Sequence, residues 1–162
     1  MSATIVVEDG TGKTDSNSYV SAADLATYMG DRGVTLVGTA EDLLINAMDY
    51  IESISYKGTK NSDAQALQWP RYGVSIDSYS VGSDELPQLL IDALCEVVIG
   101  IDGGVDPLAN LGRSTKSEQV GTIKVEYEPG TRAQTSLQAA DAKLKKLRKA
   151  GSSSVNAVVS RA

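Results

Sequence analysis

The sequence predicts a mainly α-helical protein, a compact bundle of about four helices with a small β-hairpin element and an extended C-terminal tail. Three observations lead to this prediction. Apolar residues recur at helical spacing in four segments, the period changes to two only within "SEQVGTIKVEYEPG", and the end of the chain is rich in serine. The length of 162 residues suits one domain, assigned to residues 1–150, followed by a flexible tail over 151–162.

The first two helices have recognisable start signals. Ser21 is the expected N-cap of the first helix, with Asp24 in the place of a capping-box partner, and this helix is expected to end near Gly30 to Gly33. Thr39 is the expected N-cap of the second helix. That helix runs through "TAEDLLINAMDYIESI", whose apolar residues form one continuous stripe.

The third helix has the widest apolar face and is predicted to form the centre of the core. Ser83 or Asp84 is expected to cap it, and Pro87 suits its first turn. A last helix is expected over about residues 136–149. The structural anchors predicted for the core are Trp69, Leu90, Leu94 and Val97.

The segments between the helices are predicted to be mostly turns. Residues 5–7 favour a short strand, and residues 57–63 are polar turn material. "DAQALQWPRYGV" is expected to be a short helical turn that ends at Pro70. In "SEQVGTIKVEYEPG", Ile123 and Val125 alternate with polar residues, which predicts a strand with one wet face, and Val120–Gly121 suggests the turn of a small hairpin.

The stretch "VVEDGTGKTDSNS" raises the question of a phosphate-binding loop. A complete motif needs a glycine five residues before Gly12, where this chain has Val7, and a helix that starts at the Lys-Thr pair. Glu8 and Asp9 stand where an anion would approach. The stretch is therefore interpreted as a loop without a nucleotide.

The composition disfavours an enzyme and a cofactor. The chain has no histidine and a single cysteine, so the usual partners of nucleophilic and metal chemistry are missing. Cys95 lies in an apolar helical pattern and is expected to be a buried structural thiol rather than a reactive one. We therefore expect no catalytic residue, no metal site and no cofactor.

Residues 143–149, "KLKKLRK", form the one basic cluster of the chain. Two interpretations stay open: cations favour the C-terminal end of a helix, and an amphipathic basic helix can also dock on an acidic partner. Arg71, directly after Pro70, is a candidate to reach a neighbouring subunit. The candidate partner-contact residues of the basic helix and the tail are Lys143, Lys145, Lys146, Arg148, Lys149, Val155, Val158 and Val159.

The net charge of −6 disfavours non-specific binding to nucleic acid. No run reaches the 18 or so apolar residues that span a bilayer, and the start of the chain has no signal-peptide pattern. We therefore expect no membrane partner and synthesis in a cytoplasm.

Five stretches carry a resemblance to a known family. They are "VEDGTGKTDSNSYVSAADLATYMGDRG", "AMDYIES", "QALQWPRYGV", "LPQLLIDALCEVV" and "SEQVGTIKVEYEPG", in this order. The resemblance as a whole extends over about residues 5–149. The chain resembles the small head–tail connector (neck adaptor) proteins of tailed bacteriophages. Some relatives of these proteins carry the label DnaT-like single-stranded-DNA-binding protein.

The resemblance implies a virion structural protein located in the neck, between capsid and tail. Such connectors assemble as a ring, commonly of about twelve subunits, under the portal protein, where they extend the DNA channel and bind the next neck or tail protein. Genomic DNA would pass through without specific binding. The basic helix and the tail would be the parts that meet the portal. The alternative function is that of a single-stranded-DNA-binding accessory protein of replication or packaging.

Overall fold

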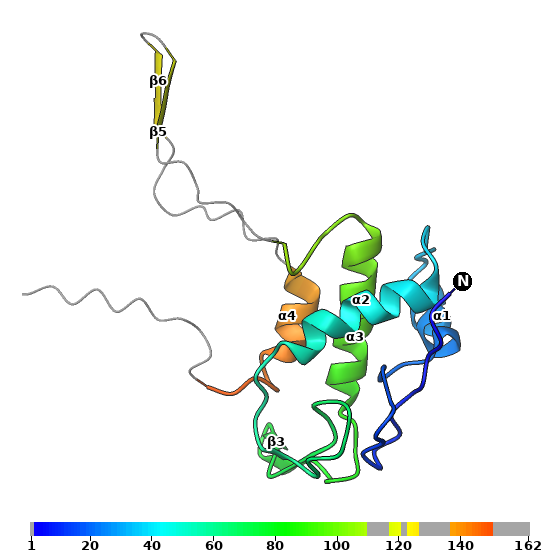
Figure 1. Cartoon of the computed structure of the whole chain (residues 1–162). Coiled ribbons are helices and arrows are strands. Elements are labelled where there is room, and N and C mark those ends of the chain that lie inside the picture. The colour runs from blue at the N-terminus through cyan, green and yellow to red at the C-terminus, as the bar shows by residue number, and fades with distance from the viewer. Residues whose placement is uncertain (1, 110–116, 121–122, 127–136, 151–162) are drawn as a thin grey trace, which may run out of the picture.

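The computed structural model describes residues 2–109, 117–120, 123–126 and 137–150. Four helices are present in these ranges: α1 (Ala22–Gly30), α2 (Ala40–Glu52), α3 (Gln88–Asp102) and α4 (Gln138–Leu144). Six short strands accompany them: β1 (Thr59–Lys60), β2 (Arg71–Tyr72), β3 (Ser75–Ile76), β4 (Tyr79–Ser80), β5 (Ser117–Val120) and β6 (Ile123–Glu126). Figure 1 shows α2 crossing α3, α4 (orange) beside α3, and β3 at the lower end of the molecule.

The prediction of a helical bundle is wrong, because the described chain has a mixed α/β fold. The strands form three antiparallel pairs, β1 with β2, β3 with β4 and β5 with β6. β1 lies in the segment that was expected to be polar turn, and β2 lies in the segment that was expected to be a short helical turn. Gly58 and Gly73 have φ of +69° and +71°, which lets the chain reverse direction beside these strands.

The N-caps predicted from the sequence agree in part with those of the structure. Ser21 caps α1 as expected: its Oγ accepts a hydrogen bond from the Asp24 N–H at 3.1 Å and donates one to the Asp24 carboxylate at 2.6 Å. Thr39 precedes α2 but makes no capping hydrogen bond with its side chain. The residue at the N-cap position of α3 is Pro87, so the expectation of Ser83 or Asp84 is wrong.

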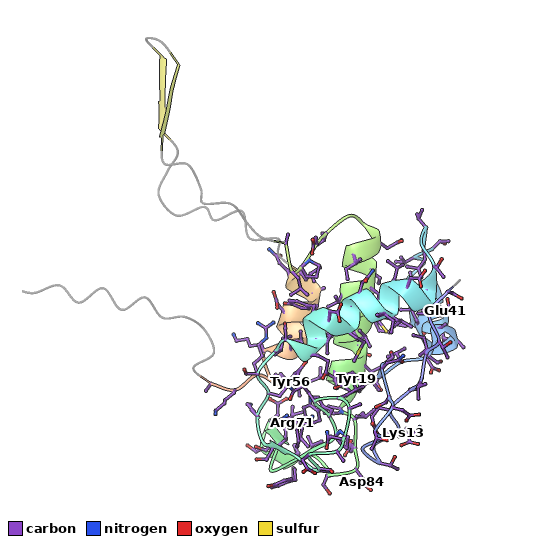
Figure 2. The ribbon with its side chains drawn as sticks, in the orientation of Figure 1. Lys13, Tyr19, Glu41, Tyr56, Arg71 and Asp84 are labelled. Atoms are coloured by element: carbon purple, nitrogen blue, oxygen red, sulfur yellow. The ribbon has the colours of Figure 1, made fainter. Side chains whose placement is uncertain are left out.

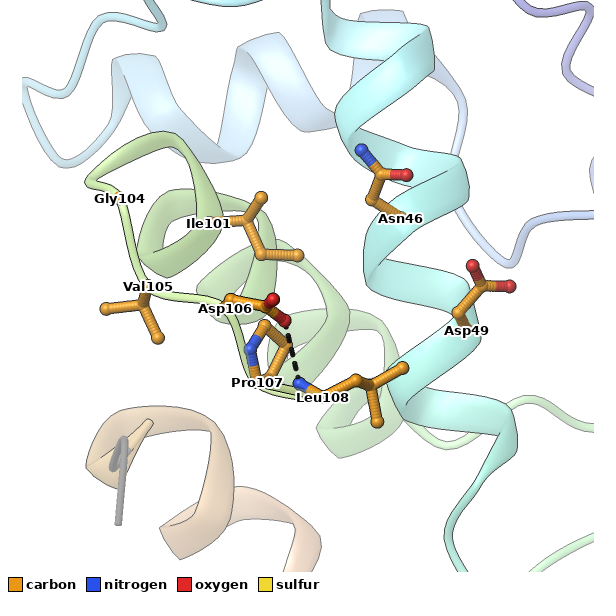
Figure 3. A pocket seen from close by; sticks show the side chains of 8 residues that line it. All are labelled: Asn46, Asp49, Ile101, Gly104, Val105, Asp106, Pro107 and Leu108. Carbon is orange, nitrogen blue, oxygen red and sulfur yellow. Dashed lines mark hydrogen bonds between the residues drawn. The ribbon is translucent and has the colours of Figure 1, made fainter. Parts of the chain in front are cut away.

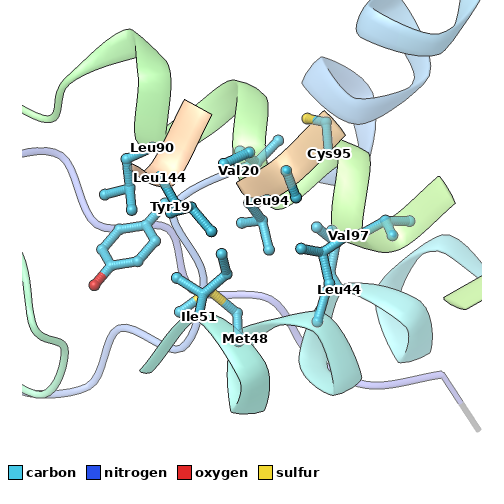
Figure 4. Packing of buried hydrophobic residues seen from close by; sticks show 14 of the residues in the cluster. Tyr19, Val20, Leu44, Met48, Ile51, Leu90, Leu94, Cys95, Val97 and Leu144 are labelled. Atoms are coloured by element: carbon cyan, nitrogen blue, oxygen red, sulfur yellow. The ribbon is translucent and has the colours of Figure 1, made fainter. Parts of the chain in front are cut away.

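The core is centred on α3, as Figure 4 shows. Leu90, Leu94 and Val97 have no exposed surface, and they pack with apolar residues of α2 and α4. Trp69 is also fully buried, and its ring meets that of Tyr56 edge to face with 5.8 Å between the centroids. The four predicted anchors thus lie inside one aliphatic cluster.

The last helix is shorter than expected. α4 ends at Leu144, five residues before the predicted end, because the chain leaves the helix to pair with the segment after α2. The Lys57 N–H donates to the Leu147 carbonyl, and the Lys149 N–H donates to the Ser55 carbonyl, both at 3.0 Å. The basic cluster therefore straddles a helix end and an extended segment.

The β5–β6 hairpin confirms the strand pattern read from the sequence. Its register pairs Ser117 with Glu126 and Val120 with Ile123. Neither strand contacts any other helix or strand among the described elements. Within the same residues, no helix is long and apolar enough to cross a membrane.

Candidate nucleic-acid interface

The loop that resembles a phosphate-binding loop encloses a carboxylate of its own chain. Glu8 is only 1% exposed, and its Oε1 accepts hydrogen bonds from the N–H groups of Gly10 (3.0 Å) and Gly12 (2.8 Å). Its Oε2 accepts from the Lys13 N–H (2.8 Å) and from Ser16 Oγ (3.0 Å). The amides that would bind a phosphate in a nucleotide-binding loop are therefore occupied by Glu8.

Lys13 is also held within this loop. Its Nζ donates to the Val7 carbonyl at 2.8 Å and forms an ion pair with Asp9 at 3.0 Å. Figure 2 labels Lys13 at the side of the molecule that carries the N-terminal segment. The hydrogen bond from Thr11, together with Lys13, lowers the pKa of Asp9 to about 2. The charged groups of Lys13 and Asp9 are thus paired with other groups of the same loop.

The structure divides the basic cluster into two groups. Lys143 and Arg148 turn toward the body: Lys143 lies 3.6 Å from Glu96, and Arg148 lies 2.6 Å from Asp141 and donates to the Tyr50 hydroxyl at 3.2 Å. Lys145, Lys146 and Lys149 form the second group, and all three are exposed.

One member of the exposed group contacts the middle segment of the chain. Lys146 Nζ lies 2.6 Å from the Asp77 carboxylate, in the turn between β3 and β4. This ion pair joins the basic cluster to the β3–β4 turn, two residues before Tyr79 on β4, which is 81% exposed. Tyr72 on β2, in the same middle segment, is 52% exposed. We call this region the Tyr–Lys surface, and its members are Lys57, Tyr72, Tyr79, Lys145, Lys146 and Lys149.

Sequence reasoning missed the two tyrosines of this surface. Tyr72 lies in the segment interpreted as a short helical turn, and Tyr79 lies just after it, where no element was predicted; in both places an aromatic residue gives no indication of exposure. The available signal was the pattern "RYGVSIDSYS", in which aromatic and β-branched residues flank the turn residues Asp77 and Ser78. Those two residues have φ of +50° and +73°, as a tight hairpin turn requires.

Charge is distributed unevenly along the chain. Residues 2–109 contain seventeen acidic and five basic residues, a formal charge of −12. Residues 137–150 contain five basic residues and one acidic residue, a charge of +4. The Tyr–Lys surface thus lies where the positively charged residues 137–150 meet the acidic body. The positive charge of residues 137–150 favours an anionic partner.

Arg71 has a structural role, and the expectation that it reaches a neighbouring subunit is wrong. It is only 8% exposed, and its guanidinium donates to the carbonyls of Lys57 (2.7 Å), Gly58 (2.8 Å) and Gln68 (3.1 Å). These bonds join the backbone just before β1 to the backbone just before β2. Figure 2 labels Arg71 in the lower part of the molecule. The sequence position after a proline does not reveal this arrangement, because it depends on contacts between distant residues.

A second polar cluster connects α2 to the middle segment. The Tyr19 hydroxyl donates to Glu52 at 2.5 Å and accepts from the Trp69 N–H at 3.1 Å, while the other Glu52 oxygen accepts from the Gln68 N–H at 2.8 Å. Burial raises the pKa of the Glu52 carboxyl above its ordinary value and also raises the pKa of Tyr19. The cluster fixes the strand segment on the helical core.

Cys95 lies in the core and is 1% exposed. Burial raises the pKa of its thiol to about 12, so the thiol is protonated at neutral pH. A protonated, buried thiol is a poor nucleophile. The position fits the structural role expected for this residue.

A depression of about 390 Å³ lies between α2 and the loop that follows α3 (Figure 3). Its lining includes the carboxylates of Asp49 and Asp106, the amide of Asn46 and the apolar side chains of Ile101 and Leu108. The two carboxylates disfavour an anionic ligand in this depression. Among the described residues, no group of histidine, cysteine and carboxylate side chains is arranged to hold a metal ion.

Comparison with known proteins shows the family of the chain. The family model described as "Putative DnaT-like ssDNA binding protein" matches residues 3–162. The chain belongs to this family. No curated protein and no solved structure matches it. The match to the DnaT-like family extends over nearly the whole sequence, including Val155, Val158 and Val159, which lie outside the residues that the structure describes, as does the whole predicted tail 151–162.

Proposed function

We propose that the protein binds single-stranded DNA through the Tyr–Lys surface. The observation that carries this proposal is the Lys146–Asp77 ion pair, which joins the exposed lysines at the positive end of the chain to a middle segment that carries two exposed tyrosines. Proteins that bind single strands without sequence preference combine cations that follow the phosphates with aromatic rings on which bases stack. Membership in the DnaT-like family supports the same function.

The acidic charge of residues 2–109 restricts the proposed DNA binding to the Tyr–Lys surface. A single strand is attracted to the lysines and repelled by the rest of residues 2–109, which carry a charge of −12. Asp77 adds a local repulsion, because its carboxylate lies within the surface and holds Lys146 at 2.6 Å. The surface is therefore small, and we expect moderate affinity with a strong dependence on salt.

The first test is to replace the two tyrosines and measure binding of a fluorescent oligothymidine by anisotropy. Stacking contributes about 1–3 kcal/mol per base. We therefore expect Tyr72→Ala and Tyr79→Ala each to weaken binding at least about fivefold. Asp77→Asn should strengthen binding severalfold, because it releases Lys146 from its ion pair, and asparagine tolerates the left-handed backbone at this position.

Arg32→Ala is a control at a cationic residue outside the Tyr–Lys surface. Arg32 lies beyond the end of α1, a helix that makes no contact with α4, and its guanidinium stacks on Tyr28. We expect its removal to leave DNA binding unchanged. If the tyrosine variants keep full affinity, or if Asp77→Asn weakens binding, single-stranded DNA is not bound at this surface.

A second candidate function is that of a structural adaptor in a phage virion, as the resemblance to head–tail connectors implies. Two observations favour it: the β5–β6 hairpin contacts no other described element, and the acidic body would let DNA slide past without adhering. In this role the protein forms a ring under the portal, and Lys145, Lys146, Lys149 and the tail 151–162 contact portal or neck proteins.

Truncation separates the adaptor function from DNA binding. We expect a variant that lacks residues 151–162 to keep the melting temperature of the full chain, because the described core uses none of these residues. It should fail to join virus particles, as measured by immunoblots of purified particles. Normal incorporation of the truncated chain, or absence of the full-length protein from particles, would contradict the adaptor role.

A further inference from the structure

The β5–β6 hairpin lacks the contacts that a two-stranded sheet needs. An isolated hairpin is marginally stable in water, and it gains stability from a further strand or from packing against a helix. β5 and β6 contact only each other among the described elements, so neither source is present in the part of the chain that the structure describes. Each strand also has one outer edge whose backbone N–H and C=O groups can pair with another strand.

The register gives the hairpin one mostly apolar face and one polar face. Val120 lies opposite Ile123, and Glu118 lies opposite Val125, so these four residues share a face. The other face contains Ser117 opposite Glu126 and Gln119 opposite Lys124. A strand added at an outer edge would extend both faces.

The sequence of β6 is complementary to itself in the antiparallel direction. If two copies of β6 pair about a two-fold axis at Val125, then Lys124 of each copy lies opposite Glu126 of the other. Val125 lies opposite Val125 on the apolar face. Opposite charges directly across a strand pair stabilise it, and within the hairpin the register pairs Lys124 and Glu126 only with uncharged residues.

We propose that two copies of this chain associate by pairing their β6 edges into one four-stranded antiparallel sheet. The occupant of the free edge is thus a second copy, selected by two symmetric Lys124–Glu126 pairs. A two-fold interface of this kind uses the same surface on both subunits and closes upon itself. The proposal does not depend on DNA binding or on the adaptor role.

Charge exchange at two positions tests this pairing with the full-length chain. Lys124→Glu places like charges opposite each other twice, and so does Glu126→Lys. We expect each single variant to raise the dimer dissociation constant at least about tenfold in sedimentation velocity, since two attractions become repulsions. An equimolar mixture of the two variants should form a heterodimer of about the original affinity, because every charged pair is then again opposite in sign. The double variant K124E/E126K should restore the homodimer.

The melting temperature of the helical core provides the folding control. Because the hairpin contacts no other described element, the core should melt at an unchanged temperature in all variants. A wild-type chain that remains monomeric at about 100 μM would overturn the proposal, since a functional edge should dimerise at such a concentration. Dimers that are insensitive to both single variants, or a mixture that does not recover, would equally exclude β6 pairing.

Discussion

Glu8 shows how one side chain can determine the meaning of a motif. Its carboxylate accepts three backbone N–H groups and one hydroxyl within the loop that follows it, and it is almost completely buried. A buried carboxylate needs such donors, because an unpaired buried charge is very costly. The glycines and Lys13 of "EDGTGKT" thus serve an internal anion.

Glu8→Gln should destabilise the fold. The side-chain amide that this substitution introduces would place N–H donors against the N–H of Lys13 or the hydroxyl of Ser16, so at least one donor loses its acceptor. Hydrogen bonds to charged groups contribute about 1.5–3 kcal/mol each, and we expect a loss of this order in the free energy of unfolding in urea. Asp9→Asn removes an exposed carboxylate of the same loop and should have a much smaller effect. Equal effects of the two variants would contradict the role assigned to Glu8.

The sequence indicated that this loop binds no phosphate, but it did not indicate the reason. Val7 in place of the first glycine was visible, and so were the two acids. The closure of the loop on Glu8 was not, because it depends on the positive φ of Gly10 and Gly12, +98° and +77°. Backbone conformations of this kind become evident only when the chain is folded.

At the scale of helices and strands, the hydrogen bonds of Glu52 connect α2 to two other segments of the chain. Glu52 ends α2 and holds Tyr19 and the backbone of Gln68, so it connects three segments that are distant in the sequence. Burial raises the pKa of this carboxyl in the folded protein. Folding is therefore coupled to the proton on Glu52.

This coupling predicts a dependence of stability on pH. Between the ordinary carboxyl pKa of 4.5 and the raised folded value, the folded protein holds a proton that the unfolded chain has released. The contribution of Glu52 to the free energy of unfolding is therefore full below 4.5 and falls as the pH rises through the folded pKa. Urea unfolding of the wild type and of Glu52→Gln, from pH 4 to 8, should show a difference that declines with rising pH.

Asp49→Asn is the matched control, since Asp49 is an exposed carboxylate of the same helix. The decline with Glu52→Gln is measured against this variant, which removes one carboxylate from α2 without touching the contacts of Glu52. A difference for Glu52 that grows with pH would reverse the sign argued above and would contradict the raised pKa.

The helices were easier to predict than the small strands. α1, α2 and α3 follow from apolar periodicity, and Ser21 follows from capping chemistry, because these signals lie within one element. β1 to β4 have two residues each, too few to show alternation, and they depend on pairings such as Lys60 with Arg71. α4 ends early because its continuation pairs with residues 55–57, some ninety positions away, which no local pattern reveals.

At the scale of the whole molecule, the core could be predicted from the sequence better than the surface. The aliphatic core around α3 was predictable as a set of buried residues, but the arrangement of the surface was not. The basic cluster was visible as "KLKKLRK", whereas its division into inward and outward groups depends on Glu96, Asp141 and Asp77. The Tyr–Lys surface exists only because the middle segment folds against the end of α4.

The packing of Gly100 against Leu137 has a consequence for how this chain can change over generations. A side chain at position 100 would collide with Leu137, so Leu137 packs directly on α3. α3 itself ends at Asp102, two residues after Gly100. The chain therefore leaves the core at the C-terminal end of α3 and re-enters it at the same end of this helix. An insertion or deletion between residues 110 and 136 therefore leaves the packing of Leu137 on Gly100 unchanged, and with it the contact between α3 and α4.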